Sequence, residues 1–579
     1  MDKAEVATIL EEIATLLELQ GENPFRCLAY TKAARAIEQL EENLADVVSE
    51  GRLDAIPGIG ATLRDKVTAL VRDGQLPFYD DLKAKTPLGL LQMLRLPGMG
   101  PKKVKALFDS LKIDDLAKLK AACEADQVSG LKGFGKKTQE KILGGLAFLD
   151  EAGERVRIDT AQAVADKVFA ELAKLPGVAR LELCGSLRRR KETIKDIDLL
   201  AVSADPIALM AAFVAMPMVK NIVGQGETKS SVVLEAFDSS RKRFFINCDL
   251  RVVAAEQFPF ALNYFTGSKE HNVAMRQRAI ARGLKLNEYE LAGPGKSASA
   301  KDEHELYKAL DLDYVEPELR ENTGELAAAA EHHLPKLVEL SDLVGTFHNH
   351  TTWSDGANSV EEMAKAAKKL GLKYLGLADH SPSLTIANGL SPERVRQQHI
   401  EIDAVNAKLK GMHIFKGIEC DILADGSLDY DDETLATFDY VVASVHSLMN
   451  QPEAEMTARI LKAIRHPSVT MLGHATGRIL LRRDGYKVDL DKILKAAAEY
   501  GTLIEINASP HRLDIDWIHC KRAKALGVQL VINPDAHETA ELANLRFGID
   551  VARRGWLEKK DVFNTQSLAE VTAAFARRK

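Results

Sequence analysis

The stretch LVGTFHNH (residues 343–350) is an apolar run that ends in two histidines, and this arrangement recurs through the C-terminal part of the chain. Five more runs carry a candidate metal ligand at or next to their last residue: YLGLADH (374–380), IFKGIEC (414–420), YVVASVH (440–446), VTMLGH (469–474) and LVINPDAH (530–537). Amphipathic segments such as SVEEMAKAAKKLG separate most of them. Counting Leu503–Ile506 as well, this alternation predicts seven parallel strands with helical crossovers, which favours a barrel. Functional residues of such barrels gather at the carboxyl ends of the strands.

Nine side chains at these strand ends are candidate metal ligands: His348, His350, Asp355, His380, Glu419, His446, His474, Asp535 and His537. Mixed imidazole and carboxylate ligands suit Zn²⁺, Mn²⁺ or Fe²⁺ better than Mg²⁺, and nine are too many for one ion. Two or three ions are therefore expected, and they would generate hydroxide for attack on a phosphate ester. A single buried histidine is more often a hydrogen-bonded core residue, but nine ligands at strand ends argue against that reading.

Composition sets the broad class of the protein. A chain of 579 residues with 46% hydrophobic and 28% charged residues is expected to be globular and to hold several domains. The N-terminus lacks the layout of a signal peptide, no apolar run is long enough to span a membrane, and the six cysteines show no paired spacing. A cytoplasmic location is therefore expected. The net charge of −7 argues only weakly against nucleic acid, because a local basic surface can hide in it.

Three segments in the first 150 residues share a hydrophobe followed by Gly-x-Gly and a helical stretch: IPGIG (56–60), LPGMG (96–100) and LKGFG (131–135). Such turns let a phosphate approach the backbone at a helix N-terminus. The alternative is helix packing with glycine at the helix ends. Three copies, each followed by a helix with basic residues near its start, favour binding of a nucleic-acid backbone. The segments resemble helix-hairpin-helix motifs. The candidate DNA-binding residues are Gly58, Gly60, Gly98, Gly100, Lys102, Lys103, Gly133, Gly135 and Lys136.

The segment LELCGSLRRRKETIKDIDLLAVS (181–203) carries a second set of carboxylates. Asp196 and Asp198 are two apart, so in a strand they share a face, and Asp249 lies in another strand-like run. Three carboxylates could hold two Mg²⁺ or Mn²⁺ ions for in-line phosphoryl transfer, and the small residues and cations from Gly185 onward could hold a triphosphate. The alternative is a solvated edge strand, which is commoner for an isolated Asp-x-Asp.

The GS-x-R-R and Asp-x-Asp pattern is similar to nucleotidyltransferases of the polymerase-beta superfamily, and YFTGS (264–268) resembles the thumb of family X DNA polymerases of the bacterial and archaeal branch. The resemblance implies that Asp196, Asp198 and Asp249 bind the catalytic metals. It also implies nucleotide-binding roles for Gly185, Ser186, Arg189, Tyr264, Phe265, Gly267, Asn272 and Arg276. Arg190 departs from the glycine found in vertebrate members. Lys66 aligns with the Schiff-base lysine of a 5′-deoxyribose-phosphate lyase; Arg26 and Tyr30 fit that site, whereas Phe25 and Thr62 do not.

The C-terminal part resembles the PHP (polymerase and histidinol phosphatase) family, through FHNHTTWSDG, ADHS, GIECDI, SVHS, GHATGR and PDAH. The expected fold is therefore multidomain, α+β and α/β, with a palm, a thumb and a (β/α)7-type PHP barrel. The expected domains are an N-terminal helical, 8-kDa-like DNA-binding domain at 1–85, helix-hairpin-helix fingers at 86–150, the palm at 151–258, the thumb at 259–318, a linker at 319–340 and the PHP domain at 341–579.

The expected function is that of a DNA-directed DNA polymerase that fills short gaps with dNTPs during repair. The PHP domain is expected to act as a 3′–5′ exonuclease, with AP endonuclease or 3′-end processing as an extension. One alternative makes the PHP domain a structural metal-bound module. Another makes it a small-molecule phosphatase, which the upstream hairpins argue against. Gapped or primed DNA is the expected partner, and a monomer is favoured.

Overall fold

The structure, a computed structural model, describes residues 1–579 apart from 2, 39, 41, 95, 97, 98, 132, 149–154, 239, 240, 294, 295 and 579. The chain divides into two compact units. The first comprises Met1–Val156, Ala163–Cys184 and Lys195–Phe258, and the second comprises Arg157–Gln162, Gly185–Ile194 and Pro259–Lys579. The arginine-rich segment that follows Cys184 thus belongs to the same unit as the thumb and the PHP region.

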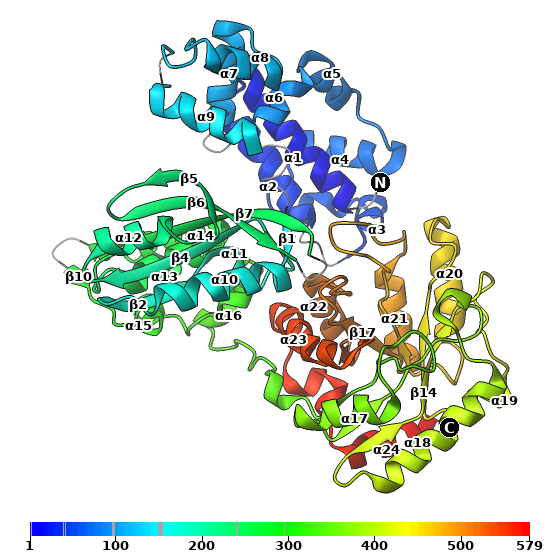
Figure 1. Ribbon diagram of the computed structural model, residues 1–579. Helices are drawn as coiled ribbons and strands as arrows, with labels where there is room; N and C mark the ends of the chain where they lie inside the picture. Colours follow the sequence, from blue (N-terminus) through cyan, green and yellow to red (C-terminus); the bar gives the residue numbers. More distant parts are fainter. Residues whose placement is uncertain are drawn as a thin grey trace. The chain divides into compact units, whose positions relative to one another are not determined.

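The first unit begins with short helices (Figure 1). They are α1 (Lys3–Gln20), α2 (Pro24–Glu38), α3 (Leu44–Ser49), η1 (Arg52–Ala55), α4 (Ala61–Asp73), α5 (Pro77–Lys85), α6 (Leu88–Met93), α7 (Pro101–Leu111), α8 (Leu116–Glu124) and α9 (Lys136–Phe148). Their apolar faces form two separate cores. One core runs from Val6 to Leu82, and the other combines Leu19 with residues from Leu90 to Ile142.

A five-stranded sheet forms the rest of the first unit, in the order β2-β4-β7-β6-β5. The strands are β2 (Val178–Leu183), β4 (Asp196–Ser203), β5 (Val219–Gln225), β6 (Lys229–Phe237) and β7 (Arg243–Val252). Two helices accompany these strands in the sequence: α10 (Ile158–Leu172), whose first residues belong to the second unit, and α12 (Pro206–Val214). Two short strands, β1 (Val156–Arg157) and β3 (Thr193–Ile194), precede β4. The β4 and β7 strands run parallel, and every other neighbouring pair is antiparallel.

The thumb region of the second unit is a small helical body with a three-stranded antiparallel sheet. Its elements are α11 (Gly185–Arg188), α13 (Phe258–Thr266), α14 (Lys269–Ala281), β8 (Lys285–Leu286), β9 (Leu291–Gly293), β10 (Lys296–Ala298), α15 (Glu303–Lys308), η2 (Pro317–Leu319) and α16 (Glu325–Ala330). The core around Met275, Leu306 and Tyr307 extends to Ala329 and Leu337. Residues 319–340, predicted as a linker, therefore contribute to a packed core.

The C-terminal region alternates parallel strands and helices, which confirms the predicted α/β architecture. Its strands are β11 (Gly345–Thr346), β12 (Tyr374–Gly376), β13 (His413–Phe415), β14 (Gly417–Asp421), β15 (Tyr440–Ser444), β16 (Met471–Leu472), β17 (Leu503–Asn507) and β18 (Leu530–Asn533). The strands form a three-stranded sheet, β11-β12-β13, and a five-stranded sheet, β14-β15-β16-β17-β18, and single bridges link these two sheets. The bridges join His380 to Glu419 and Asn349 to Ala536.

The predicted strand at 414–418 is interrupted at Lys416 and becomes β13 and β14. The helices around the strands are η3 (Leu340–Asp342), α17 (Val360–Lys369), η4 (Thr385–Ala387), α18 (Pro392–Lys408), α19 (Asp432–Leu435), α20 (Glu453–Ile464), α21 (Leu490–Tyr500), α22 (Trp517–Ala525), η5 (Thr539–Asn544), α23 (Leu545–Arg554), η6 (Lys559–Asp561), η7 (Phe563–Thr565) and α24 (Leu568–Arg578).

The interior of the barrel is filled by aromatic side chains. Phe347, Tyr374, Phe415 and Tyr440 form one core with Phe575 of α24. Tyr440 donates hydrogen bonds to the carbonyl oxygens of Phe347 and Leu377, so its buried hydroxyl has partners. The ligand-bearing ends of the strands therefore lie above a packed floor.

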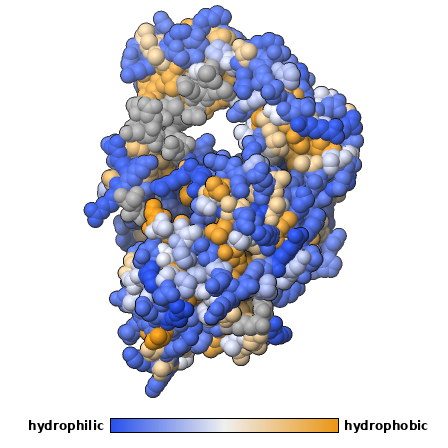
Figure 2. All heavy atoms as spheres, turned by 90° about the vertical axis from the view of Figure 1, so that its right-hand side faces the viewer, coloured by the Kyte–Doolittle hydropathy of each residue, from blue (hydrophilic) through white to orange (hydrophobic). Residues whose placement is uncertain are grey.

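The surface in Figure 2 is mostly hydrophilic, with hydrophobic atoms scattered in small groups. Among the described residues, no helix is both long enough and apolar enough to cross a bilayer.

Candidate functional site

The three Gly-x-Gly segments fold into turns with the same backbone hydrogen bond. In each, the residue between the glycines donates its N–H to the carbonyl three residues before it: Ile59 to Ile56, Met99 to Leu96 and Phe134 to Leu131. The second glycine lies directly before the following helix, and its carbonyl accepts the first helical hydrogen bonds. Gly98 lies outside the described residues.

The glycines of these turns are not required by packing within the protein. A Cβ added to Gly60, Gly100 or Gly135 would meet no heavy atom within 4 Å. Gly58 and Gly133 have φ angles of 94° and 88°, a region that favours glycine. The turns therefore leave open space beside three helix N-termini. The predicted lysines follow at the surface: Lys102 and Lys136 are exposed, and Lys103 is half-buried.

Lys66 lies beside an aromatic ring in the first unit. Its Nζ is 3.4 Å from the centroid of the Phe78 ring, and Arg26 lies 5.7 Å from the same centroid. Tyr30 stacks on Phe78 from α2. Burial, and to a smaller extent the charge of Arg26, lowers the pKa of Lys66. Of the two residues that fit the lyase pattern poorly, Phe25 has an exposed fraction of 82%, and Thr62 is exposed as well.

The parallel pairing of β4 and β7 brings the predicted palm carboxylates together. Asp198 lies directly across from Asp249 in the register, and Asp196 lies across from Asn247. Burial raises the pKa of Asp198 to about 7, and the negative charges of Asp196 and Asp249 add to the rise. Lys229 of β6, which the sequence did not single out, places its Nζ 2.7 Å from Asp249. A site with this much concentrated negative charge favours a divalent cation.

The predicted triphosphate residues Gly185, Ser186 and Arg189 lie at α11 in the second unit. Arg188 and Arg189 are both held by the thumb. Arg188 forms paired hydrogen bonds with Glu303, at 2.6 and 3.1 Å. Arg189 donates from Nε to Glu321 at 3.1 Å and from Nη1 to the carbonyl of Thr266 at 2.5 Å. These carboxylates could not be identified from local sequence, because their partners lie more than a hundred residues away.

The remaining nucleotide-binding candidates lie on the two helices that follow the sheet. Tyr264 and Phe265 are half-buried and meet edge to face at the end of α13. Asn272 of α14 donates to the carbonyl of Tyr264 at 2.7 Å, which ties the two helices together. Gly267 lies against Arg189, because a Cβ there would be 2.9 Å from Nη1 of that arginine. Arg276 is half-buried on α14.

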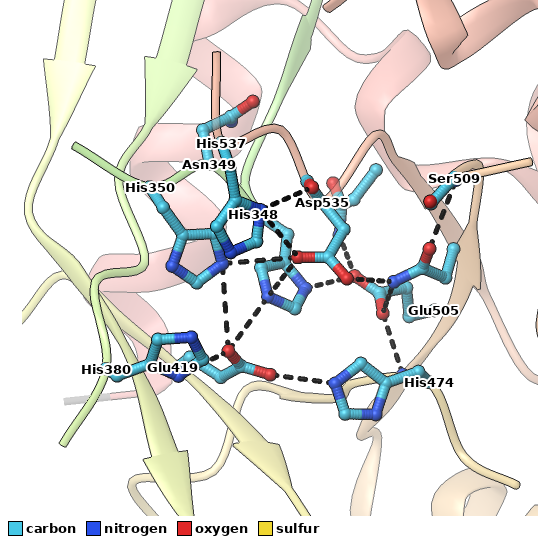
Figure 3. Close-up of polar contacts among 12 residues, drawn as sticks. His348, Asn349, His350, His380, Glu419, His474, Glu505, Ser509, Asp535 and His537 are labelled. Atoms are coloured by element: carbon cyan, nitrogen blue, oxygen red, sulfur yellow. Dashed lines mark hydrogen bonds and ion pairs between the residues drawn. The ribbon is translucent and has the colours of Figure 1, made fainter. Parts of the chain in front are cut away.

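The barrel collects its nine predicted ligands at the carboxyl ends of the strands. Their nitrogen and oxygen atoms form three groups, in each of which the atoms lie within 4.8 Å of one another: His350, Asp355, His380 and His537; His348, His350 and Asp535; His380, Glu419 and His446. His350 and His380 each belong to two groups. His474 completes the set, with its Nε2 2.9 Å from Glu419. Figure 3 shows most of these side chains converging on Glu419 and Asp535.

Several ligand atoms lack a hydrogen-bond partner among the described residues although they are buried. They are Nε2 of His348, both ring nitrogens of His350, Nδ1 of His380 and Nδ1 of His474. Burial, together with the neighbouring His537 and His380, lowers the pKa of His350 to about 3, so this ring is neutral. Neutral imidazoles with unpartnered nitrogens, next to carboxylates, are the form in which these groups bind metal. The residues present therefore fit a polynuclear metal centre.

Three buried carboxylates that the sequence analysis missed support the ligands. Glu505 accepts from Nδ1 of His348 at 2.6 Å, and Asp421 lies 2.5 Å from Nδ1 of His446. Each bond leaves the Nε2 of its histidine facing the ligand cluster. Asp379 accepts five hydrogen bonds, from Thr351, Ser354 and Gln398, and so fixes the loop between His350 and Asp355. Asp421 is the last residue of β14, so its strand-end position was a usable signal, whereas Glu505 lies within β17 and had no such signal.

Comparison with protein families gives four matches along the chain. Residues 1–76 match a helix-hairpin-helix domain, and residues 90–147 match a SAM-like helix-hairpin-helix tandem. Residues 261–321 match the DNA polymerase beta thumb, and residues 346–509 match the PHP domain.

Curated relatives match either the whole chain or one part of it. The DNA polymerase/3′-5′ exonuclease PolX of Bacillus subtilis is 39% identical over 579 residues, which covers 100% of both chains. DNA polymerase lambda of Rattus norvegicus is 27% identical over 338 residues, 54% of this chain and 55% of that one. A probable phosphatase of Thermoanaerobacter sp. is 30% identical over 234 residues, 38% of this chain and 91% of that one. The full-length match, with a polymerase-beta thumb followed by a PHP domain, shows that this chain belongs to the PolX-type family X DNA polymerases.

Proposed function

We propose that the chain is a DNA-directed DNA polymerase that fills short gaps during repair. The observation that carries this is the β4–β7 register, which brings Asp198 across from Asp249, beside Asp196, on one sheet. Two Mg²⁺ or Mn²⁺ ions bound there would supply the chemistry of phosphoryl transfer. Asp249 accepts the proton of the primer hydroxyl, and Gly185, Ser186 and Arg189 bind the triphosphate of the incoming dNTP. The site of the incoming nucleotide is lined by Tyr264, Phe265, Gly267, Asn272 and Arg276.

The second half of the proposal is that the PHP domain removes nucleotides from DNA 3′ ends. Its three ligand groups and unpartnered imidazole nitrogens support two or three Zn²⁺, Mn²⁺ or Fe²⁺ ions. Such ions would supply hydroxide for phosphodiester cleavage. Glu505 and Asp421 hold two of the imidazoles in orientation. Abasic sites and blocked 3′ ends are further substrates of the same chemistry.

DNA is the substrate that connects the two activities. The hairpin turns offer open helix N-termini and exposed lysines in the range 58–136, a combination that suits phosphate groups and reads no bases. We also propose a monomeric state and the domain boundaries given above, except that residues 319–340 extend the thumb core and are not a free linker. A protein that carries both sites on one chain could trim a 3′ end and extend it.

The test uses full-length variants on a 3′-labelled, one-nucleotide gapped DNA. Asp196→Ala should abolish incorporation of dNTPs and leave Mn²⁺-dependent degradation intact, and His348→Ala should do the reverse. Glu182→Gln, an exposed acid in the same sheet, and His466→Ala, a barrel histidine paired with Asp432 away from the cluster, are the matched controls. Loss of both activities with either single change would contradict two separate sites.

Two alternatives for the PHP domain have distinct outcomes in the same assays. If the domain is only a metal-bound brace, removing the metals lowers the melting temperature, and no nuclease activity is present to lose. The similarity to a probable phosphatase motivates the other alternative, in which His348→Ala abolishes hydrolysis of small phosphomonoesters and DNA is not degraded.

A lyase activity is a further proposal, motivated by the position of Lys66 and Arg26 beside the Phe78 ring. A nucleophilic lysine needs a lowered pKa, and burial provides this for Lys66. Arg26, beside the same ring, can hold a 5′-phosphate.

A further inference from the structure

The last residue of α23, an arginine of the PHP domain, contacts residues of the thumb region. Arg554 of α23 has an exposed fraction of 1%. Its Nη1 donates to Glu192 at 2.7 Å, and its Nη2 lies 3.5 Å from Oε1 of Glu321. The guanidinium also lies 5.1 Å from the ring of Trp517. All four residues belong to one compact unit.

Glu321 is shared between this arginine and the predicted triphosphate arginine. Oε1 of Glu321 accepts from Nε of Arg189 at 3.1 Å and also faces Arg554. Arg189 is further fixed by its Nη1, which donates to the carbonyl of Thr266 at 2.5 Å. The guanidinium of Arg189 is thus held in place at both Nε and Nη1.

We propose that Arg554 is a positioning residue for the polymerase reaction, which acts through Glu321 on Arg189. This inference rests on the proposed role of Arg189 in binding the dNTP triphosphate. A buried carboxylate with a single cationic partner attracts that partner strongly, because the surroundings screen the charge poorly. Arg554 supplies a second hydrogen-bonding cation to Glu321, in addition to the nearby charge of Lys191. Without it, Glu321 would compete with the triphosphate for Arg189.

The charge balance leads to the same expectation. Burial opposes the charged form of Glu321, but the nearby positive charges of Arg189, Arg554 and Lys191 outweigh it and lower the pKa of this carboxyl. Removal of Arg554 takes away one positive charge and leaves the carboxylates of Glu192 and Glu321 in place. The polymerase would therefore bind its anionic nucleotide less tightly, although the change lies in the PHP domain.

The neighbouring Arg553 provides a matched control. It lies on the same helix and also joins the PHP domain to the thumb, through Glu318 at 2.7 Å and Glu316 at 4.0 Å. Neither of those acids bonds to Arg189. Arg553→Gln removes the same charge and an equivalent ion pair, so it reports any general loosening of this interface.

The test is nucleotide incorporation by the full chain on a one-nucleotide gap, with KM for the dNTP and kcat measured separately. Arg554→Gln is expected to raise KM for the dNTP about 10-fold, the scale of one charge-assisted hydrogen bond. The value of kcat at saturating dNTP, the affinity for gapped DNA and the PHP nuclease rate should change little. Arg553→Gln should leave KM near the wild-type value. The double variant Glu321→Gln/Arg554→Gln should recover most of the loss, because an uncharged amide no longer competes for Arg189.

Three outcomes would overturn the inference: an equal rise in KM for Arg553→Gln, no recovery in the double variant, or a fall of kcat and nuclease rate together. If Arg554→Gln does not fold, Arg554→Lys and the double variant carry the same test. Arg189→Gln separates the proposed role of Arg189 from that of Arg554. If it leaves KM for the dNTP unchanged, the proposed function of Arg189 is wrong. If it raises KM and Arg554→Gln does not, only the role of Arg554 fails.

Discussion

Replacement of Asp198 by asparagine should stabilise the metal-free protein while it abolishes nucleotide incorporation. The pKa of Asp198 is raised from 3.8 to about 7 by burial and by its two acidic neighbours. The folded chain therefore holds this proton more tightly than the unfolded chain. It follows that wild-type stability falls as the pH rises from about 4 to about 7. Asparagine has the same shape without the charge, so it removes this penalty.

The magnitude follows from the size of the pKa shift. A shift of about three units corresponds to about 4 kcal/mol above pH 7. Asp198 shares this charge with Asp196 and Asp249 and keeps some contact with solvent, so we expect about half, roughly 2 kcal/mol. For a folded body as large as the first unit, a gain of about 2 kcal/mol corresponds to a rise of about 4–8 °C in the melting temperature.

Thermal unfolding in chelator at pH 8 and at pH 4 tests this reasoning. Asp198→Asn should melt higher than wild type at pH 8 and match it at pH 4, and Glu182→Gln should be neutral at both. Added Mg²⁺ should stabilise wild type and leave the variant unchanged. A variant that melts no higher than wild type at pH 8, or whose advantage persists undiminished at pH 4, would refute the electrostatic account.

Three further predictions concern the other sites. Glu419→Gln should reduce the bound metal, measured by elemental analysis, because Glu419 faces several imidazoles. The same change should slow 3′-end degradation at least about 100-fold. An unchanged metal content would count against the role of Glu419 as a ligand. Gly60→Ala should change stability by less than about 1 kcal/mol, because its Cβ meets nothing, yet weaken DNA binding up to about 10-fold in a titration. Lys66→Met should abolish the borohydride-trapped adduct with 5′-deoxyribose-phosphate DNA, whereas Lys83→Met, on the Tyr79 ring, should retain it.

The sequence predicted those features whose spacing follows strand geometry. Ligands after successive apolar runs must meet in a parallel barrel, and the structure gathers all nine. The Asp-x-Asp pair indicated one face of a strand in the same way, and Asp249 was found in a second strand-like run, although nothing local showed that the two strands are neighbours. The turns around Gly60 and Gly135 were predicted because a glycine pattern specifies its backbone locally.

Partners that lie far apart in the chain were not predictable. Glu321 pairs with Arg189 and Arg554, and these contacts span 132 and 233 residues. Glu505 supports His348 across 157 residues. No local periodicity marks such pairs, because a buried carboxylate and a surface carboxylate look alike in sequence. Residues 319–340 were predicted as a linker for the same reason, and yet the side chains of Arg320 and Glu325 are fully buried.

The aromatic floor closes the barrel of the PHP domain at the end opposite the ligands. Phe575 of α24 packs against Phe347, Phe415 and Tyr440, so the C-terminal helix covers that end. Ions, water and substrate are therefore expected to approach from the side of the ligands. A strand of DNA seated there would also trap the ions beneath it, and so chelators would strip the metal more slowly from the occupied enzyme than from the free one.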